Sequence, residues 1–155
     1  MKKMLIGLDY DPSAQKIAET GYAFAKSMGA QVILLHVISD YLYYSSLGYS
    51  PILGYDGFST PDPMQADTID DLQKGVQDYL DSTKKHLGDD TIQTIIKDGN
   101  FADVIVETAA ELQVDIIVLG THGRRGLDKI LMGSVAEKVL SDSTIPLLII
   151  PTKGI

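Results

Sequence analysis

The sequence predicts an α/β domain, built as an open and mostly parallel five-stranded sheet with helices on both faces, Rossmann-like in architecture. Three observations support this fold class. Short apolar runs alternate along the chain with longer segments whose apolar residues recur every three or four positions. Most of the short runs are apolar throughout, which is typical of strands buried on both faces of a parallel sheet. Glycines, prolines and cap residues separate the two kinds of segment, so strand and helix alternate along the whole chain.

Five strands and a first helix follow from local patterns. The strands are expected at residues 4–8, 32–38, 91–97, 115–119 and 145–150. The first helix is expected to have Asp11 as its N-cap and Pro12 at its first position, where proline is tolerated. Gly29 ends it, and its apolar face extends as far as Met28.

Three further helices connect the remaining strands. One covers 69–87 and ends at Gly88, and the next begins after a cap at Asn100. The last opens with an S-x-x-E capping box made of Ser134 and Glu137. In sheets of this kind, ligands bind beyond the carboxyl ends of the strands, at the point where the strand order reverses. Candidate functional residues are therefore those that directly follow strands.

The composition excludes several classes of function. A chain of 155 residues with 45% hydrophobic residues fits one domain with a full core. Its formal net charge of -8 argues against a nucleic-acid-binding surface, which needs an excess of lysine and arginine. The absence of cysteine excludes disulfides and thiol nucleophiles, and we expect a reducing, cytoplasmic environment. A membrane-spanning helix needs about 20 consecutive apolar residues, and no apolar run in the sequence approaches this length.

A glycine-rich segment follows the fourth predicted strand. Its glycines are Gly120, Gly123, Gly126 and Gly133. Glycine lets backbone amides approach a phosphate closely, and a helix that starts at Ser134 adds free amides and a favourable dipole. The segment also holds both arginines of the chain. It is neither a G-x-x-x-x-G-K-[ST] nor a G-x-G-x-x-G motif, and the alternative is a set of tight turns with solvated arginines.

The spacing of this segment resembles a known family. Gly120-x-x-Gly123, then nine residues, then Gly133-Ser134 matches the G-2x-G-9x-G-[ST] nucleotide loop of universal stress proteins. The resemblance covers nearly the whole chain, from the acidic turn at 8–11 to the last apolar run at 145–150. It implies one domain over 1–155, the sheet order 3-2-1-4-5, ATP binding and a homodimer.

The resemblance also implies which residues touch the nucleotide. Asp9 and Val37 match the positions that contact adenosine in ATP-binding members, and Leu119 matches a position that lines the nucleoside pocket. The positions for ribose and phosphates are matched by Gly120, Gly123, Gly133, Ser134 and Val135. Gly7 departs from the family, in which proline is common at that place, and so does Tyr10, where a small residue is common.

Two cationic or polar side chains within the loop are further candidates. His122 and Arg124 are expected to reach the phosphates, with a solvent-facing role as the alternative for each. Mg²⁺ is expected to accompany ATP, but it binds mainly through phosphates and water, so no protein ligand is predicted. His36 lies within an apolar strand and is expected to be a satisfied core residue rather than a ligand.

The segment 39–63 is too long for an ordinary connection and is rich in tyrosine. Because such aromatic content is unusual for disordered chain, the segment is expected to be a lid over the nucleotide, a partner-binding surface, or an insertion that covers a helix.

The expected function is that of a nucleotide-responsive regulator in stress adaptation that binds ATP or AMP. No H-E-x-x-H, G-x-S-x-G or paired-carboxylate pattern is present, so catalytic residues are not identified and ATP hydrolysis is at most slow. The apolar edge at 147–150 favours a homodimer. Two alternatives are a protein-interaction scaffold without nucleotide dependence and a phosphoacceptor receiver domain, which the polar residues after the strands also suggest. Those residues are Asp9, Asp11, Asp98, Thr121 and Lys153.

Overall fold

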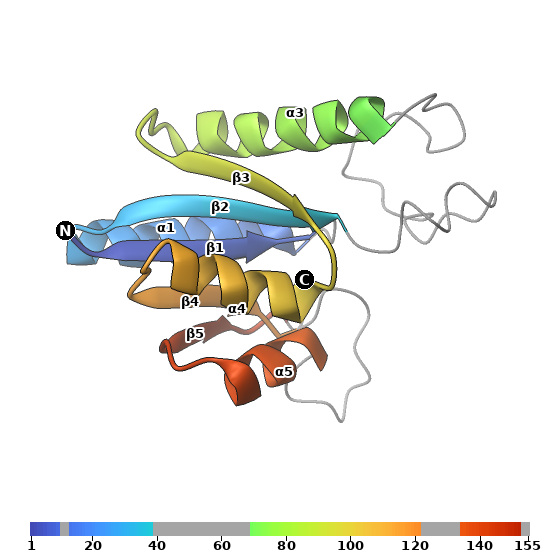
Figure 1. Cartoon of the computed structure of the whole chain (residues 1–155). Helices are drawn as coiled ribbons and strands as arrows, with labels where there is room; N and C mark the ends of the chain where they lie inside the picture. The colour runs from blue at the N-terminus through green and yellow to red at the C-terminus, as the bar shows by residue number, and fades with distance from the viewer. Residues whose placement is uncertain (10–12, 39–68, 122–133, 153–155) are drawn as a thin grey trace.

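A five-stranded parallel sheet lies at the centre of the computed structural model (Figure 1). The structure describes residues 1–9, 13–38, 69–121 and 134–152, with the side chains of 69–72 left aside. The strands are β1 (Lys3–Leu8), β2 (Gln31–Ile38), β3 (Gln93–Asp98), β4 (Ile116–Gly120) and β5 (Leu147–Ile150). The helices are α1 (Ala14–Met28), α3 (Ile69–Leu87), α4 (Phe101–Glu111) and α5 (Ser134–Asp142).

The strand order is β3-β2-β1-β4-β5, and every neighbouring pair is parallel. This confirms both the predicted fold class and the order implied by the family resemblance. The chain runs from β1 outward through β2 to β3, then returns to the other side of β1 for β4 and β5. The reversal of strand order therefore lies between β1 and β4.

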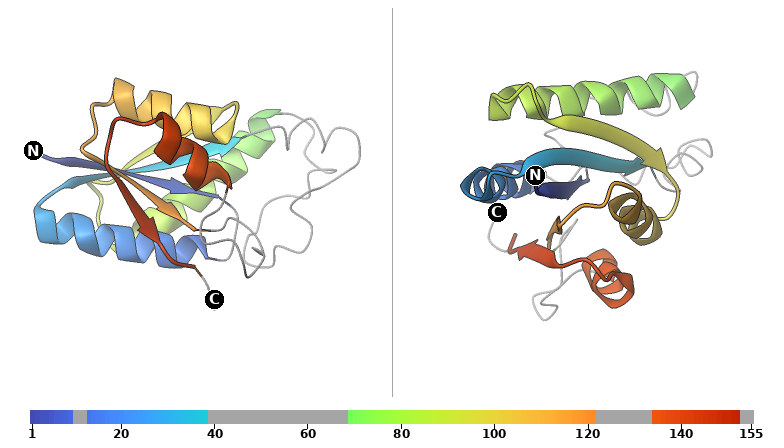
Figure 2. Two further views of the ribbon diagram at one scale, coloured as in Figure 1. Left: turned by 90° about the horizontal axis from the view of Figure 1, so that it is seen from below. Right: turned by 60° about the vertical axis from the view of Figure 1, so that its left-hand side comes forward.

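Helices cover both faces of the sheet. Helices α1 and α3 pack on one face and α4 and α5 on the other, as the opposite positions of α1 and α4 relative to β1 show (Figures 1 and 2). Alternate residues of β1 supply both apolar layers: Met4 and Ile6 belong to the layer under α1 and α3, and Leu5 to the layer under α4 and α5. This explains why β1 reads as a continuous apolar run.

The start of α1 differs from the prediction. Its N-cap is Ser13, which has helical dihedrals and makes no side-chain capping bond, so the assignment of Asp11 as N-cap is wrong. Helix boundaries read from cap residues shift easily by one or two positions, and Asp11 itself lies outside the described residues. The predicted stop is confirmed, because Gly29 has a φ of 64° and the Ala30 amide donates to the Ala25 carbonyl over 2.8 Å. Met28, in the last turn, is 37% exposed rather than buried.

The cap of α4 is confirmed, and β5 is shorter than expected. The Asn100 side chain accepts a hydrogen bond of 3.2 Å from the Asp103 amide, which ties down the first turn of α4. Strand β5 begins at Leu147 because the Ile145 amide donates instead to the Ser143 hydroxyl, over 2.8 Å, and Pro146 has no amide hydrogen to donate. The capping box of Ser134 and Glu137 stays a prediction, although α5 does begin at Ser134.

Among the described helices, none combines the length and the apolar character that a membrane crossing requires.

Candidate functional site

The carboxyl ends of β1 and β4 lie side by side where the strand order reverses (Figure 1). The chain leaves β1 at Asp9 and turns to α1 on one face, and after β4 it continues to α5 on the opposite face. Two neighbouring strands whose connections diverge in this way leave a crevice between them, which is the usual ligand site of such sheets. Helix α5 also begins at this end of the sheet (Figure 2).

Six of the predicted site residues are described, and all belong to this end of the sheet. They are Asp9, Val37, Leu119, Gly120, Ser134 and Val135. Asp9 directly follows β1 and is half-buried, and Ser134 is exposed at the first position of α5. The other four predicted residues lie outside the described residues: His122, Gly123, Arg124 and Gly133.

The two apolar site residues are deeply buried. Val37 is 2% exposed and Leu119 5% exposed, and both belong to the core layer under α4 and α5. A ligand at this edge therefore reaches little of either side chain in the described arrangement.

Leu119 fills the space beside Gly7, one of the two positions that depart from the family. A Cβ atom on Gly7 would lie 2.8 Å from Cδ2 of Leu119 and 3.7 Å from Cδ1 of Ile105. The leucine side chain thus occupies volume that any larger residue at position 7 would need. Glycine at position 7 and leucine at position 119 are complementary in size.

The packing around Gly120 leaves no space for a side chain, even without a ligand. A Cβ atom at this position would overlap with Cδ1 of Ile17, from α1, and would lie 3.1 Å from Cγ2 of Thr152. Both neighbours are buried, so they have little freedom to move aside. Close packing of β4 against α1 is therefore sufficient to explain this glycine.

Two threonines that the sequence does not single out as a pair join the ends of β4 and β5. The hydroxyls of Thr121 and Thr152 lie 3.0 Å apart, and the Thr152 amide donates to the Thr121 hydroxyl over 3.0 Å. The Thr121 amide in turn donates to the Ile150 carbonyl over 3.0 Å. These bonds hold the chain in place directly before 122–133. Sequence reasoning missed this pair, because no local pattern relates positions 31 residues apart.

His36 and Tyr79 support the turn after β1. Nδ1 of His36 lies 2.9 Å from the Leu8 carbonyl oxygen, and the Tyr79 hydroxyl donates to the Asp9 carbonyl over 3.3 Å. His36 is 2% exposed, as expected for a core histidine. Burial lowers its pKa to about 4, against the opposing effect of the bond with Leu8, so the ring is neutral near neutral pH and donates its Nδ1 hydrogen.

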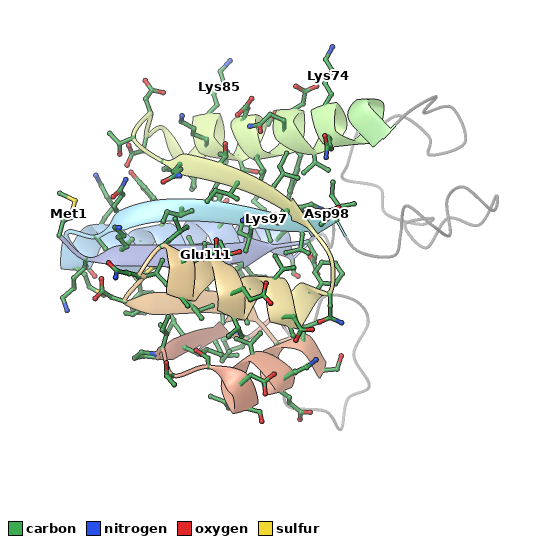
Figure 3. All side chains as sticks on the ribbon, in the orientation of Figure 1. Met1, Lys74, Lys85, Lys97, Asp98 and Glu111 are labelled. Carbon is green, nitrogen blue, oxygen red and sulfur yellow. The ribbon has the colours of Figure 1, made fainter. Side chains whose placement is uncertain are left out.

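Two of the described lysines pair with carboxylates of α4. Lys97 of β3 lies 3.5 Å from Glu111 of α4 (Figure 3), and Lys138 of α5 lies 3.1 Å from Asp103 of α4. All four side chains are about half exposed, so these pairs are weak and serve mainly to balance charge. Within the described part of the chain, no group of three histidine, aspartate or glutamate side chains is arranged to hold a metal ion.

The family model of universal stress proteins matches residues 1–151. This chain belongs to the universal stress protein family. It is 31% identical to universal stress protein MJ0577 of Methanocaldococcus jannaschii over 99% of this chain and 96% of that protein. It is 28% identical to universal stress protein YxiE of Bacillus subtilis over 96% and 97% of the two chains.

Solved structures of the family share the fold. The structure of MJ0577 superposes with a TM-score of 0.73 at 29% identity, over 99% of this chain and 98% of that one. A universal stress protein solved in complex with cAMP superposes with a TM-score of 0.61 at 22% identity, over 98% of both chains.

The observed sheet order excludes the receiver-domain alternative. A receiver domain has the order 2-1-3-4-5, in which β1 lies between β2 and β3, whereas here β1 lies between β2 and β4. Asp9 after β1 and Asp98 at the end of β3 therefore belong to strands that β2 separates, whereas a receiver domain has these strands side by side. Thr121, another polar residue that follows a strand, is buried and bonded to Thr152.

Proposed function

We propose that this universal stress protein binds ATP or AMP across the carboxyl ends of β1 and β4 and acts as a nucleotide-responsive regulator in stress adaptation. One observation carries the proposal. The segment with the G-2x-G-9x-G-[ST] spacing starts at the end of β4 and finishes at the start of α5, both at the edge where the strand order reverses. Both described ends of the segment therefore lie at the edge of the sheet where a ligand is expected.

The phosphate end is supported by the start of α5. Ser134 is exposed at the first position of a nine-residue helix, so the amides of the first turn have no partners within the helix. Together with the helix dipole, such amides favour an anion. We assign positive charge for the phosphates to Arg124 and a further hydrogen-bond donor to His122, both within the loop.

The adenosine end is assigned to the opposite side of the crevice. Asp9 is the first polar residue after β1, and Val37 lies in the neighbouring strand, where Leu8 pairs with His36. A carboxylate such as that of Asp9 can accept a hydrogen bond from a ribose hydroxyl or from the adenine amino group. The cAMP complex belongs to a protein that shares only the fold with this chain, yet its ligand is also an adenine nucleotide.

We assign the chain a regulatory rather than a rapid catalytic role. In the part of the chain that the structure describes, no three metal-binding side chains gather, so Mg²⁺ would be carried by the phosphates and water. Asp103 and Glu111 of α4 are paired with lysines, and Asp9 is assigned to the adenosine end. ATP hydrolysis, if it occurs, is slow. The protein is assigned to the cytoplasm on its lack of cysteine.

The second edge of β5 is the surface we assign to a homodimer. Within the described residues β5 pairs only with β4, and Leu147, Leu148 and Ile149 are half-buried. An apolar strand with free backbone groups on one side pairs readily with its own copy. A mass of one chain by light scattering at working concentration would contradict this assignment.

The test of nucleotide binding begins with the nucleotide that co-purifies. Chromatography of the denatured protein should release ATP or AMP, and added nucleotide at 100 times its dissociation constant should stabilise the fold by about 2.7 kcal/mol. Gly123→Val should abolish this stabilisation, because a branched side chain blocks the approach of backbone amides to phosphate. Gly126→Val is the matched control, since it makes the same change in the same loop outside the motif.

Three results would contradict the proposal. A wild-type protein that is not stabilised by any adenine nucleotide would favour the scaffold alternative. A Gly123→Val variant with wild-type affinity would refute the loop assignment. Equal losses in Gly123→Val and Gly126→Val would show a general disturbance of the loop rather than a motif-specific role.

A further inference from the structure

We propose that His36 and Tyr79 are positioning residues for the adenosine end of the site, an inference that rests on the nucleotide binding proposed above. Neither belongs to the loop or to the residues implied by the family motif. They act on the backbone of two consecutive residues. His36 holds the Leu8 carbonyl, and Tyr79 holds the Asp9 carbonyl.

These two bonds fix the orientation of the peptide groups on both sides of the Asp9 α-carbon. Leu8 is the last residue of β1, and the chain must turn away from the sheet immediately after it. Backbone carbonyls that leave a strand at a buried place need partners other than the sheet ladder. Because both carbonyls have side-chain donors, the backbone from which the Asp9 carboxylate projects is held from two directions.

The two donors come from different elements and support each other. His36 belongs to β2 and Tyr79 to α3, and their rings meet edge to face with centroids 6.5 Å apart and planes at 77°. This contact and the burial of His36 restrict both rings to one arrangement. A displacement of α3 would therefore be felt at Asp9 through the Tyr79 hydroxyl.

A coupling between α3 and the nucleotide follows from this arrangement. Binding that orders Asp9 favours the position of α3 in which Tyr79 reaches the Asp9 carbonyl, and the converse holds by linkage. Helix α3 is the first described element after the segment 39–68, so the coupling joins the adenosine end to the part of the chain that follows this insertion.

The experiment removes the Tyr79 hydroxyl and compares the nucleotide affinity of this variant with that of a second variant, which loses a different tyrosine hydroxyl. Each of the two hydroxyls forms one hydrogen bond between distant parts of the chain. Tyr79→Phe keeps the ring and its contact with His36. Tyr22→Phe is the matched control, because the Tyr22 hydroxyl bonds the Asp89 carboxylate over 3.0 Å, in the turn before β3 and thus at the opposite end of the sheet. Each variant loses one hydrogen bond: Tyr79→Phe loses the bond from α3 to Asp9, and Tyr22→Phe loses the bond from α1 to Asp89.

Calorimetric titration of the full chain with AMP and with ATP distinguishes positioning from stability. Tyr79→Phe should weaken both nucleotides by the same factor, about three- to tenfold, because they share the adenosine group. Tyr22→Phe should leave both affinities unchanged. In the wild-type protein, the ¹⁵N resonance of His36 Nδ1 should also shift when AMP is added.

The outcomes separate this inference from the proposed function. A wild-type protein that binds neither nucleotide refutes both. If the wild type binds but Tyr79→Phe keeps its affinity, or if Tyr22→Phe loses as much, the positioning role is wrong and the nucleotide site stands. A loss for ATP alone would place the effect at the phosphates and would also overturn the inference.

Discussion

The substitution Gly120→Ala tests whether the first glycine of the loop serves packing or phosphate. The added methyl group would overlap with Cδ1 of Ile17 and lie 3.1 Å from both Cγ1 of Ile17 and Cγ2 of Thr152. Ile17 is 4% exposed and Thr152 8% exposed, so neither has solvent to move into. Overpacking of this kind costs about 1–3 kcal/mol.

We expect a loss of about 2 kcal/mol, in the middle of that range, because one clashing atom ends a flexible side chain while Thr152 is β-branched and hydrogen-bonded. For a chain of this size the melting temperature should fall by about 4–8 °C. Urea denaturation without nucleotide measures the free energy directly, and the slope against urea concentration should stay constant.

Ile17→Val provides the decisive comparison, since it deletes the atom that the new methyl group meets. Alone it should cost about 1 kcal/mol. Combined with Gly120→Ala, the total should be smaller than the sum of the single losses by about 0.5 kcal/mol or more. Strictly additive losses would show that Ile17 is not the obstacle. A Gly120→Ala protein of wild-type stability that has lost nucleotide affinity would refute the packing explanation altogether.

Two further predictions concern stability alone. Burial lowers the pKa of His36 to about 4 in the folded chain, whereas an unfolded histidine has a pKa of about 6.5. Between these two pH values the His36 side chain is protonated in the unfolded chain and neutral in the folded chain. The free energy of unfolding should therefore fall as the pH decreases through this range. In His36→Gln this part of the slope should disappear, as urea denaturation at each pH would show, and an unchanged slope would contradict the assignment. Glu19 and Asp89 also have lowered pKa values, but their ordinary values of 4.5 and 3.8 place their effect mainly below about pH 5. At the start of α4, Asn100→Ala should cost about 1 kcal/mol and Asn100→Asp much less, because aspartate caps as well as asparagine; equal losses by thermal denaturation would count against the cap.

Most of the fold was predictable because it depends on local patterns. The apolar run of β1 and the glycine that ends α1 carry their information within a few residues. The order of the strands is different, since it depends on how distant segments pair, and here it came from the family resemblance. The cap of α1 is misplaced where Asp11, Pro12 and Ser13 stand together, so that more than one residue could start the helix. Strand β5 starts late at Leu147 because Ser143 takes the Ile145 amide, a contact that the apolar run does not reveal.

The candidate site was predictable only in part. The loop spacing predicts a site at the carboxyl ends of β1 and β4, but the contacts that hold these ends in place join residues far apart in the sequence. Tyr79 and Asp9 are 70 positions apart, and no periodicity relates them. Gly120 shows the opposite difficulty: the sequence suggests a phosphate-binding role, whereas the packing of Ile17 already requires glycine. A motif identifies such a position without showing whether packing or ligand binding requires glycine there.

The bonds between Thr121 and Thr152 impose an order on assembly. The described hydrogen-bond partner of the Thr121 hydroxyl is Thr152, which is synthesised 31 residues later. Strand β4 can therefore pair with β1 before the hydrogen bonds at its own carboxyl end can form. The chain at Thr121, directly before residues 122–133, is held in place only after β5 has paired with β4 and Thr152 can form its bonds with Thr121. A chain that stops between these two threonines would have most of its sheet and no firm anchor for the segment that follows β4.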